Sequence, residues 1–156
     1  HLGQVFITLP TIYTDLYQLT KFTCEGGGKK AVDEPAMCLV CGRILNAGNK
    51  KASGVFTNAA GECTIHARSC GAGLGVYFLV QQCQVLLIRG SRGTYWPSLY
   101  LDASGEVNEQ RGQNRPLFLS AKRYKKLEEL YVNHQVSKEI VRKRSSAETV
   151  IRMDWF

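Results

Sequence analysis

The apolar positions near the start of the chain predict a short extended segment followed by a helix. Residues 5–9 form a largely apolar run that stops at Pro10. Thr11 can then cap an amphipathic helix that runs to about Phe22, because apolar residues recur there at helical spacing. We expect this segment to pack as an arm on the rest of the molecule.

Further along, the pattern changes from strands to helices. The apolar runs 76–80 and 83–88 predict two paired strands joined by a short turn. Apolar residues at helical spacing then predict one helix from Ala121 to about His134, with Ser120 as its cap. A second helix is predicted over 136–144.

Five potential metal ligands lie between these regions in two compact clusters. Cys38 and Cys41 are separated by two residues, and Cys63, His66 and Cys70 follow after a gap. This spacing is poor for disulfides but suits a metal ion. A set of small buried apolar cysteines is the less favoured alternative.

The residues around the clusters predict how the ligands are presented. Gly42 permits a left-handed turn after the first cluster. The segments 43–45 and 54–57 are predicted to form a hairpin. Thr64 can cap a short helix over 65–70.

Together these features predict a zinc-organised α+β domain of treble-clef-like form, with antiparallel hairpins and flanking helices. Structural zinc is typically held by four soft ligands in a closed tetrahedron. We predict one structural zinc ion bound by Cys38, Cys41, His66 and Cys70. Cys63 is the alternative fourth ligand, because it lies three residues before His66.

A catalytic function for these residues is less favoured. A nucleophilic cysteine with His66 or His134 as its base conflicts with metal ligation, which would occupy the thiolate. A catalytic zinc needs an open position, which five candidates for four places disfavour. The glycines in 71–75 follow a helix and precede a strand, whereas phosphate loops run from strand to helix. Asp102 and Glu106 are more typical of a turn than of an acid–base pair.

Composition limits the remaining possibilities. The 156 residues suffice for one domain, and the 44% hydrophobic and 21% charged content is that of a globular protein. No apolar run is long enough to span a membrane. Six cysteines without a signal-peptide pattern favour a reducing compartment, the cytosol or the nucleus. The net charge is +7, but the basic groups at 122–126 and 142–144 are interleaved with glutamate, so solvated helix faces are favoured over nucleic-acid binding.

Aromatic residues offer one candidate interaction surface. Tyr95, Trp96 and Tyr100 lie in a predicted extended segment, 95–101, and would form a peptide-docking site if they were exposed together. Burial in the core is the favoured interpretation. The two aromatic residues that close the chain predict that the tail docks back onto the domain.

Several motifs resemble one family when they are taken in order. They are Cys38-Leu39-Val40-Cys41-Gly42; Gly61 to Gly73, which includes Cys63, His66 and Cys70; Tyr100-Leu101-Asp102; Gly105-Glu106; Arg111-Gly112; and Pro116-Leu117-Phe118-Leu119-Ser120 with Arg123-Tyr124. This order is similar to the extreme C-terminal region of the UBR-box N-recognins, the large ubiquitin ligases of the N-degron pathway. The resemblance covers nearly the whole chain.

The resemblance implies a zinc-containing cap associated with autoinhibition and with the closed arrangement of the ligase. In that family the degron-binding UBR box and the RING are separate upstream regions, so this chain itself is not expected to be catalytic. Two departures bear on partner contacts: residues 46–54 contain no cysteine, and the loop 110–116 is longer and more polar.

We therefore predict a single zinc-binding domain over 1–156, with an N-terminal arm and helix (1–24), a zinc and β core (36–119) and a helical tail (120–156). Its expected partners are other domains of the same RING-type ligase, and also a ubiquitin-conjugating enzyme or a substrate protein. The alternatives are a partial RING-like module that contacts a conjugating enzyme and a module that binds peptides or degrons.

Overall fold

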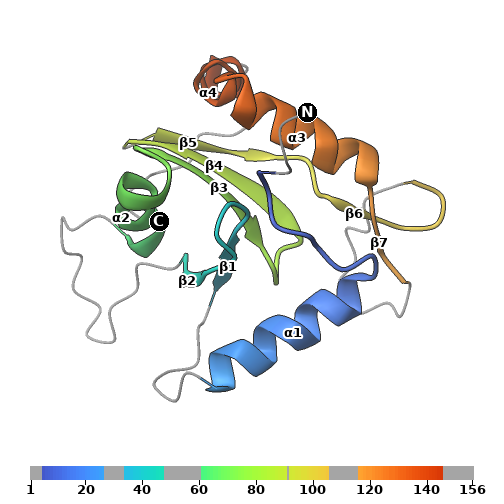
Figure 1. Cartoon of the computed structure of the whole chain (residues 1–156). Helices are drawn as coiled ribbons and strands as arrows, with labels where there is room; N and C mark the ends of the chain where they lie inside the picture. The colour runs from blue at the N-terminus through green and yellow to red at the C-terminus, as the bar shows by residue number, and fades with distance from the viewer. Residues whose placement is uncertain (1–4, 27–33, 48–60, 91, 106–115, 146–156) are drawn as a thin grey trace.

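The structure is a computed structural model, and it describes residues 5–26, 34–47, 61–90, 92–105 and 116–145. Of these, residues 20–26, 144 and 145 are described as backbone only. This part of the chain forms a small α+β domain with an antiparallel sheet and four helices (Figure 1). The α+β class predicted from the sequence is confirmed. None of the described helices is long and apolar enough to cross a membrane.

A five-stranded antiparallel sheet with strand order β2-β1-β3-β4-β5 forms the centre of the fold. Its strands are β1 (Pro35–Cys38), β2 (Ile44–Asn46), β3 (Leu74–Leu79), β4 (Gln84–Arg89) and β5 (Arg92–Trp96). A separate two-stranded ribbon pairs β6 (Tyr100–Leu101) with β7 (Phe118–Leu119).

The central strands read as continuous apolar runs because both faces of the sheet are covered. Along β3, Val76 and Phe78 belong to one apolar cluster, while Tyr77 and Leu79 belong to the other. Successive side chains of a strand point to opposite faces, so these two clusters lie on the two sides of the sheet.

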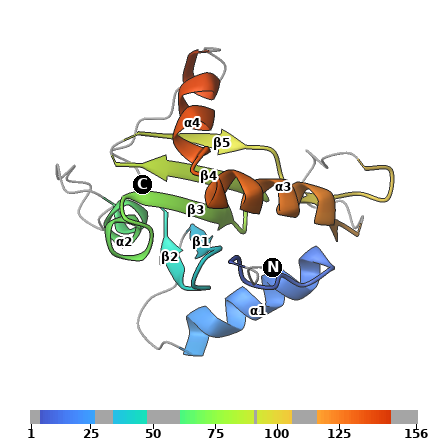
Figure 2. The ribbon, with the colours of Figure 1, turned by 45° about the horizontal axis from the view of Figure 1, so that its top comes forward.

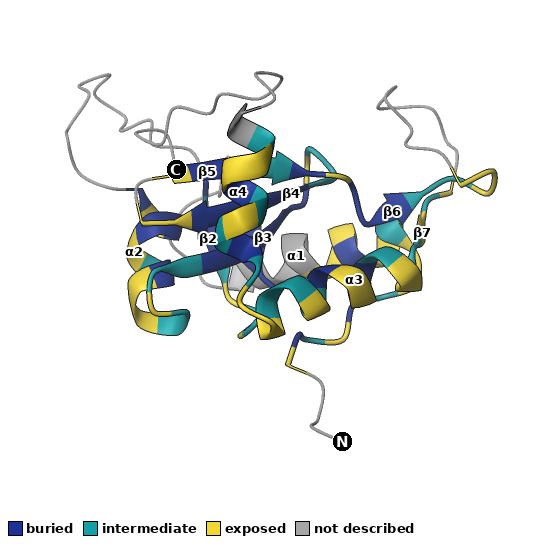
Figure 3. Cartoon of the chain, turned by 90° about the horizontal axis from the view of Figure 1, so that it is seen from above, coloured by how far each residue is buried: buried dark blue, intermediate teal, exposed yellow. Residues whose placement is uncertain are grey.

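Four helices supply the covering layers: α1 (Tyr13–Gly26), α2 (Glu62–Cys70), α3 (Ala121–Val132) and α4 (Val136–Ser145). We call the apolar cluster that contains Val76 and Phe78 the first cluster, and the one that contains Tyr77 and Leu79 the second cluster. Helices α1, α3 and α4 bury Leu16, Leu127 and Ile140 in the first cluster. Helix α2 buries Cys63 in the second cluster. Figures 1 and 2 show α3 and α4 across the sheet from α2, and Figure 3 shows buried strands beneath α4.

Helix α3 begins as the sequence predicts, and the turn that follows its last residue has a strained backbone. The Ser120 hydroxyl accepts a hydrogen bond from the Arg123 backbone N–H at 3.2 Å, which confirms the predicted cap. At the other end His134 has a φ of +58°, and the Gln135 N–H donates to the Leu130 carbonyl at 2.8 Å. This closing turn therefore places a histidine where glycine is usually preferred.

Helix α2 begins earlier than predicted, and its predicted cap is wrong. The helix starts at Glu62 after Gly61, and Thr64 lies inside its first turn. Thr64 is buried, and its hydroxyl has no hydrogen-bond partner among the described residues. The burial of Cys63 and Ala67 explains the shift, because packing of this helix face outweighs the capping preference of threonine.

Two predicted extended segments are also rearranged. Strand β2 pairs with β1, with Ala36 opposite Leu45. The hairpin therefore turns at residues 38–43, which contain Cys38 and Cys41 and which we call the knuckle. The predicted partner segment, 54–57, lies outside the described residues, as does the predicted docking of the C-terminal tail. The predicted extended segment 95–101 is divided, because β5 ends at Trp96 and Pro97 provides no N–H to continue a ladder.

The N-terminal arm joins α3 to the knuckle. The Glu128 carboxylate of α3 accepts the backbone N–H groups of Val5 and Phe6 at 3.1 and 2.8 Å. The Ile7 N–H donates to the Leu39 carbonyl at 2.8 Å. The predicted packing of this arm on the domain is therefore confirmed.

Candidate metal centre

The turn between β1 and β2 presents the first two candidate ligands. The Gly42 N–H donates to the Cys38 carbonyl at 2.8 Å, and the Cys38 N–H donates to the Arg43 carbonyl at 2.9 Å. Gly42 has a φ of +81°, which a residue with a side chain adopts at a cost. This closed turn holds the side chain of Cys41 beside that of Cys38.

Helix α2 presents the other two candidates. His66 and Cys70 are four residues apart, so they project from one face of the helix. The helix contacts β2, β3 and β4, which brings this face to the knuckle. Two segments that are distant in sequence are thereby joined at one point.

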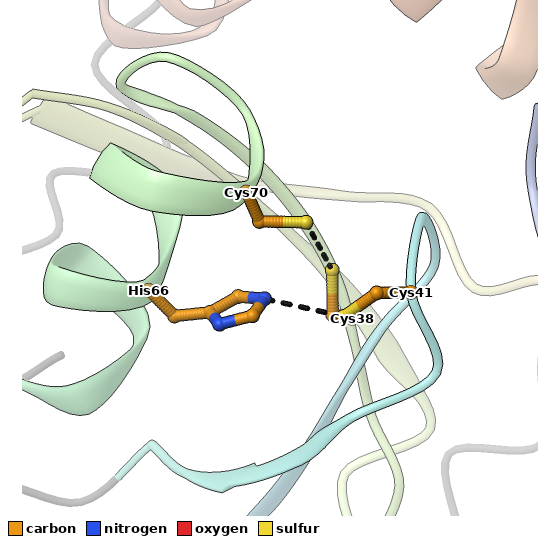
Figure 4. A group of neighbouring side chains, drawn as sticks. All are labelled: Cys38, Cys41, His66 and Cys70. Atoms are coloured by element: carbon orange, nitrogen blue, oxygen red, sulfur yellow. Dashed lines mark hydrogen bonds between the residues drawn. The ribbon is translucent and has the colours of Figure 1, made fainter.

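Four side chains converge there (Figure 4). The donor atoms of Cys38, Cys41, His66 and Cys70 all lie within 4.8 Å of one another. Cys38 Sγ lies 3.9 Å from Cys70 Sγ, and Cys41 Sγ lies 3.3 Å from His66 Nε2. This group could hold a metal ion. It matches the set predicted from the sequence.

Cys63 lies outside this group. Its side chain is fully buried in the second apolar cluster, beside residues of the sheet such as Ala36 and Leu79. Burial raises the pKa of the Cys63 thiol to about 12, so it packs as a protonated, apolar side chain. Of the two alternatives left open by the sequence, the structure brings Cys70 to the other three candidate ligands.

Burial also determines the protonation of the candidate ligands Cys38 and His66 before any metal binds. It raises the pKa of the Cys38 thiol to about 12, although backbone N–H groups of Cys41 and Val40 act to lower it. Burial, and then the positive charge of Arg43, lower the pKa of His66. The imidazole is therefore held neutral, which is the form that binds metals.

Tyr77 of β3 supports α2 from the sheet. Its hydroxyl donates to the Cys63 carbonyl at 2.6 Å, and its ring centroid lies 6.3 Å from that of His66. A Cβ added to Gly75 would come within 2.5 Å of the Tyr77 ring. Sequence patterns show Tyr77 only as one apolar position of a strand, so they give no signal for this supporting role.

The other sequence candidates do not form a second site among the described residues. Trp96 and Tyr100 are buried in the first cluster, and Tyr95 packs against the second. These three therefore form no exposed aromatic surface, because they lie on different faces of the sheet and in the core. His134 is exposed at the end of α3, and the Asp102 carboxylate accepts the Ser104 N–H at 2.9 Å, as in a turn.

The glycines after α2 end the helix. The N–H groups of Gly71 and Gly73 both donate to the Ala67 carbonyl, at 3.0 and 2.8 Å. Gly73 has a φ of +94°. This arrangement agrees with the favoured interpretation of a helix stop. Glu106 and Arg111 lie outside the described residues.

The fold and this site define a class of protein: a small α+β domain in which three cysteines and a histidine converge where a hairpin turn meets a short helix. The family described as "Proteolysis_6 C-terminal" matches residues 5–133, and the chain belongs to this family. The sequence-based identification with the C-terminal region of the UBR-type N-recognins is confirmed.

Named relatives extend this match. The chain is 34% identical to the human E3 ubiquitin-protein ligase UBR2 over 152 residues, which is 96% of this chain and 9% of the relative. It is 32% identical to mouse E3 ubiquitin-protein ligase UBR1 over 152 residues, again 96% of this chain and 9% of the relative. Human E3 ubiquitin-protein ligase UBR3 is 34% identical over 134 residues, 86% of this chain and 7% of the relative. The chain thus spans less than a tenth of the length of these relatives.

Proposed function

We propose that this chain is a zinc-stabilised regulatory and protein-interaction domain that caps or autoinhibits a ubiquitin ligase of the N-degron pathway. The observation that carries the proposal is the convergence of four metal-binding side chains from two separate elements. The membership of the chain in a family of ligase C-terminal domains supplies its context.

The donor set supports zinc as the metal. Three thiols and one imidazole are a usual set for a structural zinc site. In a regular tetrahedron with Zn–S bonds of about 2.3 Å, two sulfur atoms lie about 3.8 Å apart. Cys38 Sγ and Cys70 Sγ are 3.9 Å apart.

A closed set of four ligands supports a structural ion and not a catalytic one. All four positions of the tetrahedron would be taken by protein atoms, which leaves no place for an activating water. When bound, the ion would join the β1–β2 turn to α2. We therefore propose that the domain itself is not catalytic, and that catalysis belongs to a RING elsewhere in a parent ligase of the cytosol and nucleus.

The metal can be tested by elemental analysis of the purified chain. We expect about one zinc ion per chain, and near-complete loss of zinc in Cys38→Ser, because three remaining ligands bind weakly. Cys83→Ser is the control, since Cys83 Sγ contacts Ser98 Oγ and not the cluster. If the chain keeps the same near-UV circular dichroism after complete removal of zinc, the ion does not organise the fold.

The regulatory role needs a separate test in a parent ligase. We expect ubiquitin discharge from a charged conjugating enzyme to be faster when this domain is deleted or when Cys38→Ser disrupts it. The alternative, a partial RING-like module, predicts discharge by the isolated chain. Among the described residues a single four-ligand group is present, whereas a full RING uses two zinc ions, so we expect the isolated chain to be inactive.

A further inference from the structure

Basic charge is concentrated on one layer of this domain. The described side chains from 121 to 143 include seven basic and three acidic groups, whereas the remaining described side chains carry four of each. This layer is formed by α3 and α4, whose outer surfaces are exposed in Figure 3. The positive net charge of the described residues therefore belongs to the α3–α4 layer.

Two of the three described glutamates in this layer already have partners. The Glu128 carboxylate turns toward the arm, where it accepts the N–H groups of Val5 and Phe6. Glu139 forms a salt bridge with Arg142 on α4. The sequence suggested local neutralisation along the helix, but the fold removes Glu128 from the exposed face of α3.

Three lysines remain together on that exposed face. Lys122, Lys125 and Lys126 are spaced by three and four residues, so they form one stripe on the surface of the helix. All three are exposed, and none has a salt bridge among the described residues. Glu129 is the one exposed acidic residue of α3 beside them. We call this set the lysine stripe.

We propose that the lysine stripe docks an acidic segment of the parent ligase polypeptide. This inference rests on the proposed function, which places the domain within a larger ligase. Clustered positive charge complements an acidic surface and orients it, but exposed pairs bind weakly. A partner in the same polypeptide has an effective concentration of about millimolar for a short flexible linker, so weak contacts suffice. Relatives more than ten times the length of this chain provide ample sequence for such a partner.

A polypeptide fits this surface better than a nucleic acid. Single-stranded nucleic acids are held by aromatic side chains on which bases stack, together with positive charge. The large exposed apolar side chains described on α3 and α4 are Val132 and Val141, and the aromatic residues Tyr124 and Tyr131 of α3 face the arm. The described part of this layer thus offers charge without a stacking platform.

The partner can be located in the intact parent ligase by carbodiimide cross-linking. This reagent joins a lysine amine to a carboxylate in contact with it, with loss of one water. We expect mass spectrometry to link Lys122, Lys125 or Lys126 to aspartate or glutamate in another region of the same polypeptide. The proposal is overturned if the lysine stripe forms no such link while other lysines do, or if it links only to the conjugating enzyme.

The charge specificity can be measured on this chain with an oligo-glutamate peptide. We expect Lys122→Gln, Lys125→Gln and Lys126→Gln together to weaken peptide binding about tenfold at low salt. The control replaces Thr14, Gln18 and Gln81, exposed residues outside α3 and α4, by glutamate, so the net charge falls equally. Equal weakening in both variants would show a net-charge effect only and would contradict a local site.

Two further measurements separate the possible failures. An oligonucleotide that displaces the peptide at equal concentration of charge would overturn the choice of a polypeptide partner. The zinc content of the lysine variant is expected to match that of the unchanged chain, since the lysine stripe contains no candidate ligand. Absence of zinc from the unchanged chain would refute the proposed structural ion, and the cross-links would still decide the inference about the stripe.

Discussion

At the scale of single residues, the position of α2 depends on Tyr77, which is not one of the four candidate ligands. Tyr77 is fully buried and donates its hydroxyl hydrogen bond to the Cys63 carbonyl in the first turn of α2. Burial raises the pKa of this phenol, so it remains a donor. The contact fixes the start of the helix whose later residues are His66 and Cys70.

Removing the Tyr77 hydroxyl tests this contact. We expect Tyr77→Phe to lower the free energy of unfolding by about 1 kcal/mol, because one buried hydrogen bond is lost while the ring is kept. The measurement is urea unfolding of the zinc-loaded chain. Unchanged stability of Tyr77→Phe would argue against this role for the Tyr77 hydroxyl.

His134 permits a prediction of opposite sign. It is exposed and has a φ of +58°, a left-handed backbone conformation that costs free energy in a residue with a side chain. We expect His134→Gly to stabilise the domain by about 1 kcal/mol, measured as a higher midpoint of unfolding. Asn133→Gly is the control, because Asn133 has a φ of −89° and gains nothing from glycine. No gain at position 134 would mean that the histidine makes a compensating contact.

At the scale of elements, the N-terminal arm connects the surface of α3 to the β1–β2 turn, which carries two of the candidate ligands. The Glu128 carboxylate holds the arm at its start. The Leu39 carbonyl accepts the Ile7 N–H, and Leu39 lies between the candidate ligands Cys38 and Cys41 in the sequence. Phe6 stacks on Tyr124 with ring centroids 5.6 Å apart. The arm is therefore fixed by charge, backbone pairing and aromatic packing together.

The two neighbouring glutamates of α3 provide a matched test of this arrangement. We expect Glu128→Ala to destabilise the domain by about 1–3 kcal/mol and to speed hydrogen exchange at Val5 and Phe6, since two charge-assisted bonds are lost. Glu129→Ala, which removes an exposed carboxylate one residue away, should change stability little. Similar effects of the two substitutions would show that Glu128 does not hold the arm.

At the scale of the whole molecule, sequence patterns predicted the parts of the fold that depend on local spacing. Periodicity indicated the central strands and α3, and the Cys-x2-Cys motif indicated the knuckle, because these features arise within a few residues. The choice between Cys63 and Cys70 depended on which face of α2 meets the sheet, which packing alone decides. The start of α2 was missed because burial of Ala67 outweighed the capping preference of Thr64. The turning of Glu128 toward the arm, which takes its carboxylate away from the lysine stripe, likewise required the folded arrangement.

This distribution of contacts predicts the order in which structure is lost if the proposed zinc ion is removed. The candidate ligands join α2 to the hairpin, whereas α3 and α4 are held by a separate apolar cluster that includes Leu127 and Ile140. We expect chelation to destabilise the whole domain, because metal binding and folding are linked. Before global unfolding, hydrogen exchange should accelerate first at Ala67 of α2, because this short helix loses its cross-link, while Leu127 of α3 stays protected. Replacement of the chelated zinc should restore both rates. If α3 opens before α2, the metal acts on the fold through contacts other than the four ligands.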